Sequence, residues 1–244
     1  SGLISGQSNC LSETLFEGVF KQTRELDDYL ARTDRIIGPL YGLPVSVKDR
    51  FDVKGVDTPL GYVGRLFKSA EQDAAMVTVL SRFGAVIITK TAFSQRIFRD
   101  ITIVSQPFSD LPTSGTRLEL LSVASQLISV VRISRQEILQ EASLPAVLSG
   151  LSELKPSSIR FPYSGAPVSH EGQSHVPSSA GTLARELSTL TIVTKECLLT
   201  APWNLDPTVT PLPWREDVYQ TVQQRPLKIG IIFDDGVVKP HPEI

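Results

Sequence analysis

A strand–helix–strand pattern in the first half of the sequence limits what this chain can fold into more than any other feature. Apolar runs over 44–47 and 85–89 do not alternate with polar residues, as in strands that are buried on both faces. Between them, apolar residues recur with a helical period over 69–80, after a Ser69 that resembles the start of a capping box. Gly84 stands where a helix C-cap is expected. Two buried strands joined by a helix form a βαβ unit, so we predict an α/β protein.

Other segments have weaker periodic patterns. Helices are expected near residues 12–31, with a bend or break near Thr23, and near 181–199, and a buried strand is expected at 227–233. The stretch 118–138 also has helical apolar spacing. No internal repeat or linker divides the sequence, so residues 1–244 are predicted to form a single domain.

Lys48 ends the first apolar run and is the most informative single residue. A charged lysine at the buried end of a strand is costly, because desolvation favours the neutral amine. A neutral amine can accept a proton, so Lys48 is a candidate general base. The alternative is a surface lysine at the end of a strand.

Composition excludes several classes of partner. The formal net charge of −2 gives no basic field for nucleic acid or an anionic membrane surface. The most apolar stretch, residues 118–131, is interrupted by polar residues and falls short of a membrane span. Cys10 and Cys197 lie far apart without CxxC spacing, which favours a reducing compartment, and we expect a cytoplasmic protein. The three histidines lie in polar stretches and are expected on surface loops, so no metal site is predicted.

Several motifs in order carry a resemblance to a known family. The first block includes Gly38–Lys48, Phe51–Gly55 and Gly84–Thr91. The second begins at Leu144 and includes Leu154–Ser158, Arg160–Pro162, Gly181–Arg185 and Lys228–Gly230. Together they resemble the amidase signature family, and the fungal acetamidase-like amidases in particular. The resemblance implies a mixed β-sheet with helices on both faces, here incomplete because members are longer. It implies hydrolysis of a small-molecule carboxamide to a carboxylate and ammonia, without a cofactor.

The family mechanism uses a Ser-Ser-Lys triad, and the resemblance assigns Lys48 to its lysine. A bridging serine on a cis peptide passes a proton from the nucleophilic serine to this lysine, and a glycine-rich loop supplies the oxyanion hole. Residues 96–143 should carry that loop, yet their only glycine is Gly115. Ser114 is a weak candidate for the bridging serine. Gapless counting back from Leu144 places Glu141 at the nucleophile position. Ser143 is the nearest serine to that position but lies two residues away, so it is a weak candidate for the nucleophile.

A shift of the reading frame would account for the missing glycine- and serine-rich loop. Moving the frame by one nucleotide over codons for Ile-Gly-Gly-Ser-Ile can give Leu-Glu-Glu-Ala-Ser. Residues 139–143 agree with that product except at Gln140. We therefore hypothesise that much of 96–143 is out-of-frame or mis-spliced translation within an amidase gene.

The sequence thus predicts an amidase-family protein with little or no activity. Three hypotheses remain: a residual enzyme, a pseudoenzyme or binding module that keeps a pocket, and a degraded gene product without function. Without a serine to accept and pass on a proton, Lys48 has no relay, and catalysis by the family mechanism should nearly vanish.

Overall fold

The computed structural model describes residues 11–91, 129–135, 151–168, 178–226 and 228–230. The chain divides into two compact units, Ser1–Pro213 and Trp214–Ile244. Each unit is described by itself below, and the single domain over 1–244 stays a prediction.

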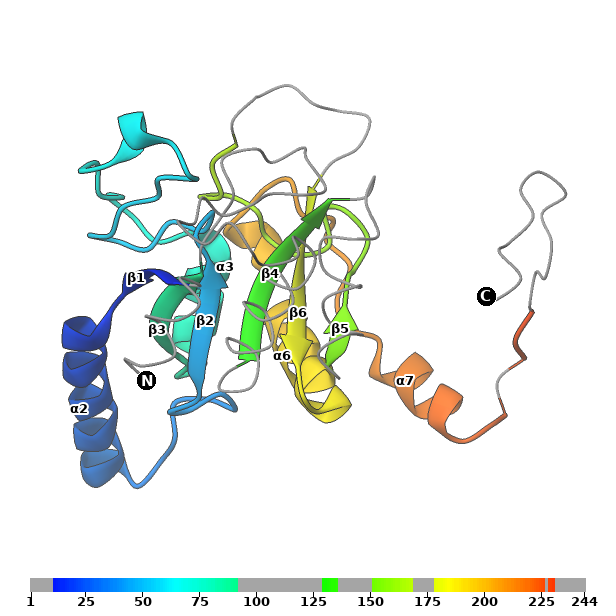
Figure 1. Ribbon diagram of the computed structural model, residues 1–244. Coiled ribbons are helices and arrows are strands. Elements are labelled where there is room, and N and C mark those ends of the chain that lie inside the picture. The colour runs from blue at the N-terminus through cyan, green and yellow to red at the C-terminus, as the bar shows by residue number, and fades with distance from the viewer. Residues whose placement is uncertain (1–10, 92–128, 136–150, 169–177, 227, 231–244) are drawn as a thin grey trace, which may run out of the picture. The chain divides into compact units, whose positions relative to one another are not determined.

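The first unit is built on a six-stranded mixed sheet (Figure 1). Its strands lie in the order β1-β3-β2-β4-β6-β5. Strands β2 and β3 are parallel, as are β2 and β4, whereas β1 on β3, β4 on β6 and β5 on β6 are antiparallel. The strands are β1 Leu11–Thr14, β2 Pro44–Lys48, β3 Val86–Thr91, β4 Ser129–Arg135, β5 Ser152–Leu154 and β6 Ser178–Ala184. The predicted α/β class with a mixed sheet is confirmed.

The predicted βαβ unit is β2, helix α3 (Ala75–Arg82) and β3. Gly84 takes a φ of 85°, and its N–H bonds to the carbonyl of Ser81, so it ends the helix as expected. The helix begins later than predicted, because Ser69 does not cap it. The Ser69 hydroxyl instead donates a hydrogen bond to Asp57 in the loop before the helix.

Two predicted helices begin with a strand. Residues 11–14 form β1 ahead of helix α2 (Phe16–Thr33), and residues 178–184 form β6 ahead of α6 (Leu187–Leu199). No break occurs near Thr23. The helix expected over 181–199 is therefore wrong at Thr182 and Leu183. Pairing with both β4 and β5 extends them instead, a tertiary effect that local spacing does not contain.

The helix suggested for 118–138 is wrong where the structure describes it, since residues 129–135 form β4 between β2 and β6. Val130, Val131 and Ile133 are β-branched, which suits a strand. The rest of that stretch lies outside the described residues. Of the strand predicted at 227–233, residues 228–230 have no regular structure, and the others also lie outside the described part.

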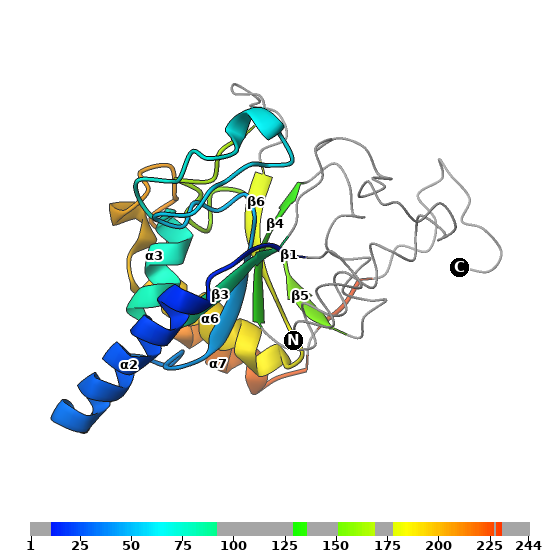
Figure 2. The same cartoon turned by 60° about the vertical axis from the view of Figure 1, so that its left-hand side comes forward.

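Helices α3 and α6 lie on one face of the sheet, and α2 lies beside β3 (Figure 2). Val45 of β2, Leu80 of α3 and Leu190 of α6 line one small apolar gap, so these elements meet in the core. All three side chains are at most 2% exposed. Burial of this apolar surface holds the helical layer on the sheet. A second helical layer is not among the described residues.

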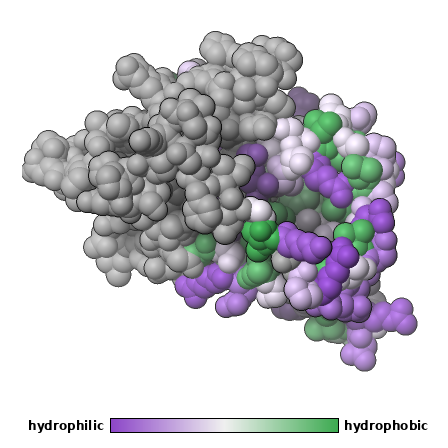
Figure 3. Space-filling view, turned by 90° about the vertical axis from the view of Figure 1, so that its right-hand side faces the viewer, coloured by the Kyte–Doolittle hydropathy of each residue, from purple (hydrophilic) through white to green (hydrophobic). Residues whose placement is uncertain are grey.

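Short elements complete the described part. The 3₁₀ helices are Val63–Arg65 and Pro202–Asn204. In the second unit, helix α7 spans Glu216–Gln223, and the rings of Trp214 and Tyr219 lie 5.3 Å apart. On the face drawn in Figure 3, hydrophobic side chains occur in separate groups among hydrophilic ones. Among the described helices, none is long and apolar enough to cross a bilayer.

Candidate functional site

Lys48 is the last residue of β2, at the edge where the parallel strands β2 and β3 both end. The preceding Val45, Ser46 and Val47 are buried, whereas Lys48 itself is partly exposed. The chain then turns, with the Phe51 N–H donating to the Lys48 carbonyl. Carboxyl ends of parallel strands are where open α/β sheets bind ligands. The lysine predicted from the sequence therefore stands at a position suited to chemistry.

The two serines considered as its partners, Ser114 and Ser143, lie outside the described residues. Their placement near Lys48 stays a prediction. Within the described part, Ser46 is the serine nearest to Lys48 in sequence, and its buried hydroxyl has no hydrogen-bond partner.

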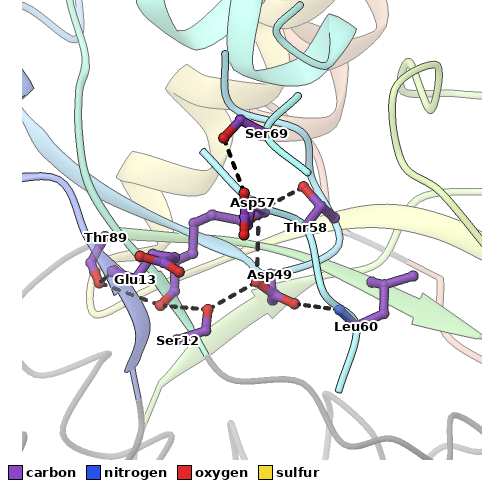
Figure 4. A network of polar contacts seen from close by, with 9 residues as sticks. Ser12, Glu13, Asp49, Asp57, Thr58, Leu60, Ser69 and Thr89 are labelled. Atoms are coloured by element: carbon purple, nitrogen blue, oxygen red, sulfur yellow. Dashed lines mark hydrogen bonds and ion pairs between the residues drawn. The ribbon is translucent and has the colours of Figure 1, made fainter. Parts of the chain in front are cut away.

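A buried ion pair lies directly beside Lys48. Lys90 of β3 is 0% exposed and its Nζ lies 3.6 Å from Oδ1 of Asp49, which is 1% exposed. The Lys90 ammonium also donates to the Asp57 carbonyl at 2.7 Å and to Oγ1 of Thr58 at 2.9 Å. Figure 4 shows Asp49, which follows β2, and Asp57 and Thr58 of the next loop close together in this network. Lys90 therefore closes a network that joins the ends of two strands to the following loop.

The electrostatics of Lys90 balance two opposing effects. Burial lowers the pKa of Lys90 below its usual value, and the carboxylates of Asp49, Asp52 and Glu13 offset only part of this effect. Two of the three N–H donors of the ammonium are used in hydrogen bonds to Asp57 and Thr58, and the carboxylate of Asp49 supplies an opposite charge. This arrangement suits a structural cation.

Sequence reasoning did not single out Lys90, although a signal was present. It follows the apolar run 85–89, so it falls within a strand that was expected to be buried. A lysine inside a buried strand requires a carboxylate partner. The argument from the cost of burial, made for Lys48, applies more strongly to Lys90, which is the more buried of the two.

The segment 161–167 packs against the chain that follows Lys48. The carbonyl of Gly165 accepts the Asp52 N–H, and Gly165 lies so close to Ala74 that an added Cβ would stand 2.6 Å from its Cα. Arg50, 5% exposed, donates from Nε to the Pro167 carbonyl at 2.9 Å. Its guanidinium also lies 5.3 Å from the centre of the Tyr163 ring, within the range of a cation–π contact. Arg50 thus ties the chain after Lys48 to the segment 161–167.

The carboxylate of Asp206 holds the segment 161–167 through hydrogen bonds to its backbone. Its Oδ2 accepts the backbone N–H groups of Tyr163 and Ser164 at 2.7 and 2.8 Å, and its Oδ1 accepts both donors of Thr208. Burial would raise the pKa of Asp206, but these hydrogen bonds to the carboxylate together lower the pKa below its usual value. The charged carboxylate therefore orders the segment that contacts the lysine loop.

Other reactive groups of the described part lie elsewhere. Burial raises the pKa of the Cys197 thiol to about 12, although Arg160 opposes the rise, so the thiol stays protonated and unreactive. A cavity of about 630 Å³ lies between α2, the loop at 53–56 and α3. Its lining includes Glu17, Lys54 and Asp73 but not Lys48. Within the described ranges, no cluster of three metal-binding side chains occurs.

The chain is similar to fungal amidases over nearly all of its length. It is 40% identical to "Amidase 1" of Gibberella moniliformis, over 98% of this chain and 47% of that protein. It is 33% identical to "Acetamidase" of Emericella nidulans, over 97% of this chain and 45% of that protein. The chain thus spans about half the length of the curated relatives it matches.

Solved structures share the fold. A structure of fatty acid amide hydrolase matches with a TM-score of 0.75 at 26% identity, over 87% of this chain and 38% of that one. The peptide amidase from Stenotrophomonas maltophilia matches with a TM-score of 0.62 at 21% identity, over 85% of this chain and 43% of that one, and so supports the fold alone. These matches confirm the amidase-like α/β architecture.

The family model of the amidases matches residues 3–102 and 143–244 and leaves 103–142 unmatched. Both blocks of motifs identified in the sequence fall in the matched regions, and so does the segment that ends at Lys48. The resemblance inferred from those motifs is confirmed: the chain belongs to the Amidase family.

Proposed function

We propose that this chain keeps the lysine position of the amidase site at Lys48 and hydrolyses amides weakly or not at all as it stands. The observation that carries the proposal is the gap at 103–142 in the match to the family model. That gap lies within the stretch 96–143, where the glycine- and serine-rich loop was sought and not found. The position of Lys48 at the carboxyl end of β2 supports the assignment of the lysine.

The chemical reason for weak activity is the cooperation within the triad. A lysine in this mechanism accepts a proton only through a serine that has itself received it from the nucleophile. Removing one member of such a unit costs about as much as removing all of them, so Lys48 alone contributes little. The substrate class proposed is a small carboxamide, in keeping with the relatives named amidase and acetamidase. Which carboxamide is bound does not follow from the family.

The test uses the purified chain. Ammonia release from acetamide and labelling by a serine-directed fluorophosphonate should both stay at the buffer level, and Lys48→Ala should change neither. A matched control is Lys21→Ala, because Lys21 is an exposed lysine of α2 with an 80% exposed side chain. Hydrolysis or labelling that Lys48→Ala abolishes and Lys21→Ala leaves intact would overturn the proposal in favour of a residual enzyme.

A second candidate is a binding module that keeps a pocket without turnover. The buried core and the ordered network beside Lys48 favour it over a degraded gene product. It predicts a cooperative thermal transition and saturable binding of a carboxamide by calorimetry, and a chain that shows neither would contradict it.

The genomic sequence over codons 96–143 tests the frame-shift hypothesis, which requires an alternative frame rich in glycine and serine. The cytoplasmic location and the lack of nucleic-acid binding stay predictions.

A further inference from the structure

We propose that the buried ion pair of Lys90 and Asp49 is a positioning pair for Lys48: it fixes the chain immediately after Lys48 and neutralises the charge beside it. The inference rests on the proposed assignment of Lys48 to the amidase site. It concerns two residues to which the sequence analysis assigned no role, and it makes Lys90 a second lysine that the site requires for a different reason.

Asp49 is held from three sides. Its backbone N–H donates to the carbonyl of Thr91, which joins it to the end of β3. Its Oδ2 accepts the Leu60 N–H at 2.9 Å, and its Oδ1 accepts the Ser12 hydroxyl of β1 at 2.9 Å. Together with Lys90, these contacts come from two strands and one loop, as Figure 4 shows for Ser12 and Leu60. Asp49 therefore cannot move unless several buried hydrogen bonds break.

Lys90 supplies the positive charge that compensates the buried carboxylate of Asp49. A buried carboxylate without a counter-charge is strongly destabilising, and the ammonium at 3.6 Å provides that counter-charge. The same ammonium bonds Asp57 and Thr58 and so holds the loop that in turn supplies the Leu60 N–H. The charged groups that act on Lys90 are Asp49, Asp52 and Glu13.

The consequence for Lys48 follows from its place in the chain. Lys48 is the last residue of β2 and Asp49 is the first residue of the turn that follows, so contacts that fix Asp49 also hold the chain directly after Lys48. The two residues are neighbours, with Cα atoms about 3.8 Å apart, so an uncompensated charge on Asp49 would act on the Lys48 amine. Pairing with Lys90 removes that effect and leaves Lys48 in its place.

The experiment measures the pH dependence of Lys48 acylation in the folded chain, using trace isotope-labelled acetic anhydride and mass spectrometry of the Lys48 peptide. Lys90→Met leaves Asp49 unpaired, so the midpoint for Lys48 should rise by about half a pH unit or more. Asp49→Asn leaves Lys90 unpaired, so the midpoint should fall by a similar amount. The double variant, in which no buried charge is left alone, should return to within about 0.2 pH units of the wild type.

Opposite signs distinguish positioning from a general loss of structure. Partial unfolding would move the midpoint in the same direction in both single variants, towards that of an exposed lysine. Lys21→Met is the matched control and should leave the Lys48 midpoint unchanged. If a single variant does not fold, the other single variant and the double variant decide by the same criteria. Shifts of the same sign, no shift in a folded single variant, or a double variant displaced from the wild type would overturn the proposal.

The readout does not require turnover. A chain without amidase activity still gives a Lys48 midpoint, so failure of the positioning pair and failure of the proposed function are distinguishable. The first appears as unchanged or parallel midpoints, and the second appears as hydrolysis that depends on Lys48.

Discussion

The ends of β2 and β3 each carry a lysine, and the two lysines differ in what surrounds them. Lys48 is partly exposed at the end of β2, whereas Lys90, one residue before the end of β3, is wholly buried beside Asp49. Lys90 makes two hydrogen bonds and an ion pair inside the protein, so its role is structural. A partly exposed lysine at a strand end remains accessible for chemistry. The comparison teaches that burial alone does not mark a base, because the partners decide the role.

The largest expected effect separates the two lysines by stability. Lys90→Met should lower the free energy of unfolding by about 3–5 kcal/mol, because it leaves the Asp49 carboxylate buried and unpaired. Lys48→Met should lower it by about 1 kcal/mol or less, because this partly exposed residue lies outside the core. Urea unfolding followed by circular dichroism measures both. Equal losses of unfolding free energy would contradict the comparison, since they would give the two lysines the same structural role.

A smaller effect tests the segment that packs behind the lysine loop. Gly165 has a φ of 78° and touches Ala74, whereas Gly42 has a φ of 70° and an added Cβ there would meet nothing within 4 Å. Both alanine variants carry the strain of a left-handed backbone, about 1–2 kcal/mol. Gly165→Ala should lower the free energy of unfolding by about a further 1–3 kcal/mol, because the added methyl group overpacks against Ala74.

The same unfolding measurement checks this pair, with Gly42→Ala as the matched control. Equal costs would mean that the close approach of 161–167 to the start of α3 contributes nothing. A larger cost at Gly165 would show that the carbonyl bonded to Asp52 is held in place by packing as well as by hydrogen bonding.

The smallest effect concerns pH. The hydrogen bonds that lower the pKa of Asp206 favour its charged form in the folded chain, so it adds stability above its unfolded pKa, near 3.8. That contribution is lost as the pH falls through the lower, folded pKa. Asp206→Asn should therefore cost about 1–2 kcal/mol at pH 7 and progressively less below about pH 4. Urea midpoints of both proteins from pH 3 to 7 measure the difference, and a difference that does not change with pH would contradict it.

The sequence by itself determined the βαβ unit and the position of Lys48. Strands β2 and β3 are short continuous apolar runs, and Gly84 between helix and strand marks the turn, so local pattern and fold agree. The same local reasoning gave the wrong structure at 129–135 and at 181–184. Both segments are strands because they pair with neighbours distant in sequence, and spacing within a segment carries no record of such pairing.

Tertiary structure alone decided the roles of Lys90 and Asp206. Their partners, Asp49 and Tyr163, lie 41 and 43 residues away in the chain, so the burial of each charge and its compensation become visible once the strands and loops have assembled. The sequence could place a lysine at the end of β2. Whether a lysine holds its proton depends on the acceptors around it, and the fold brings those together.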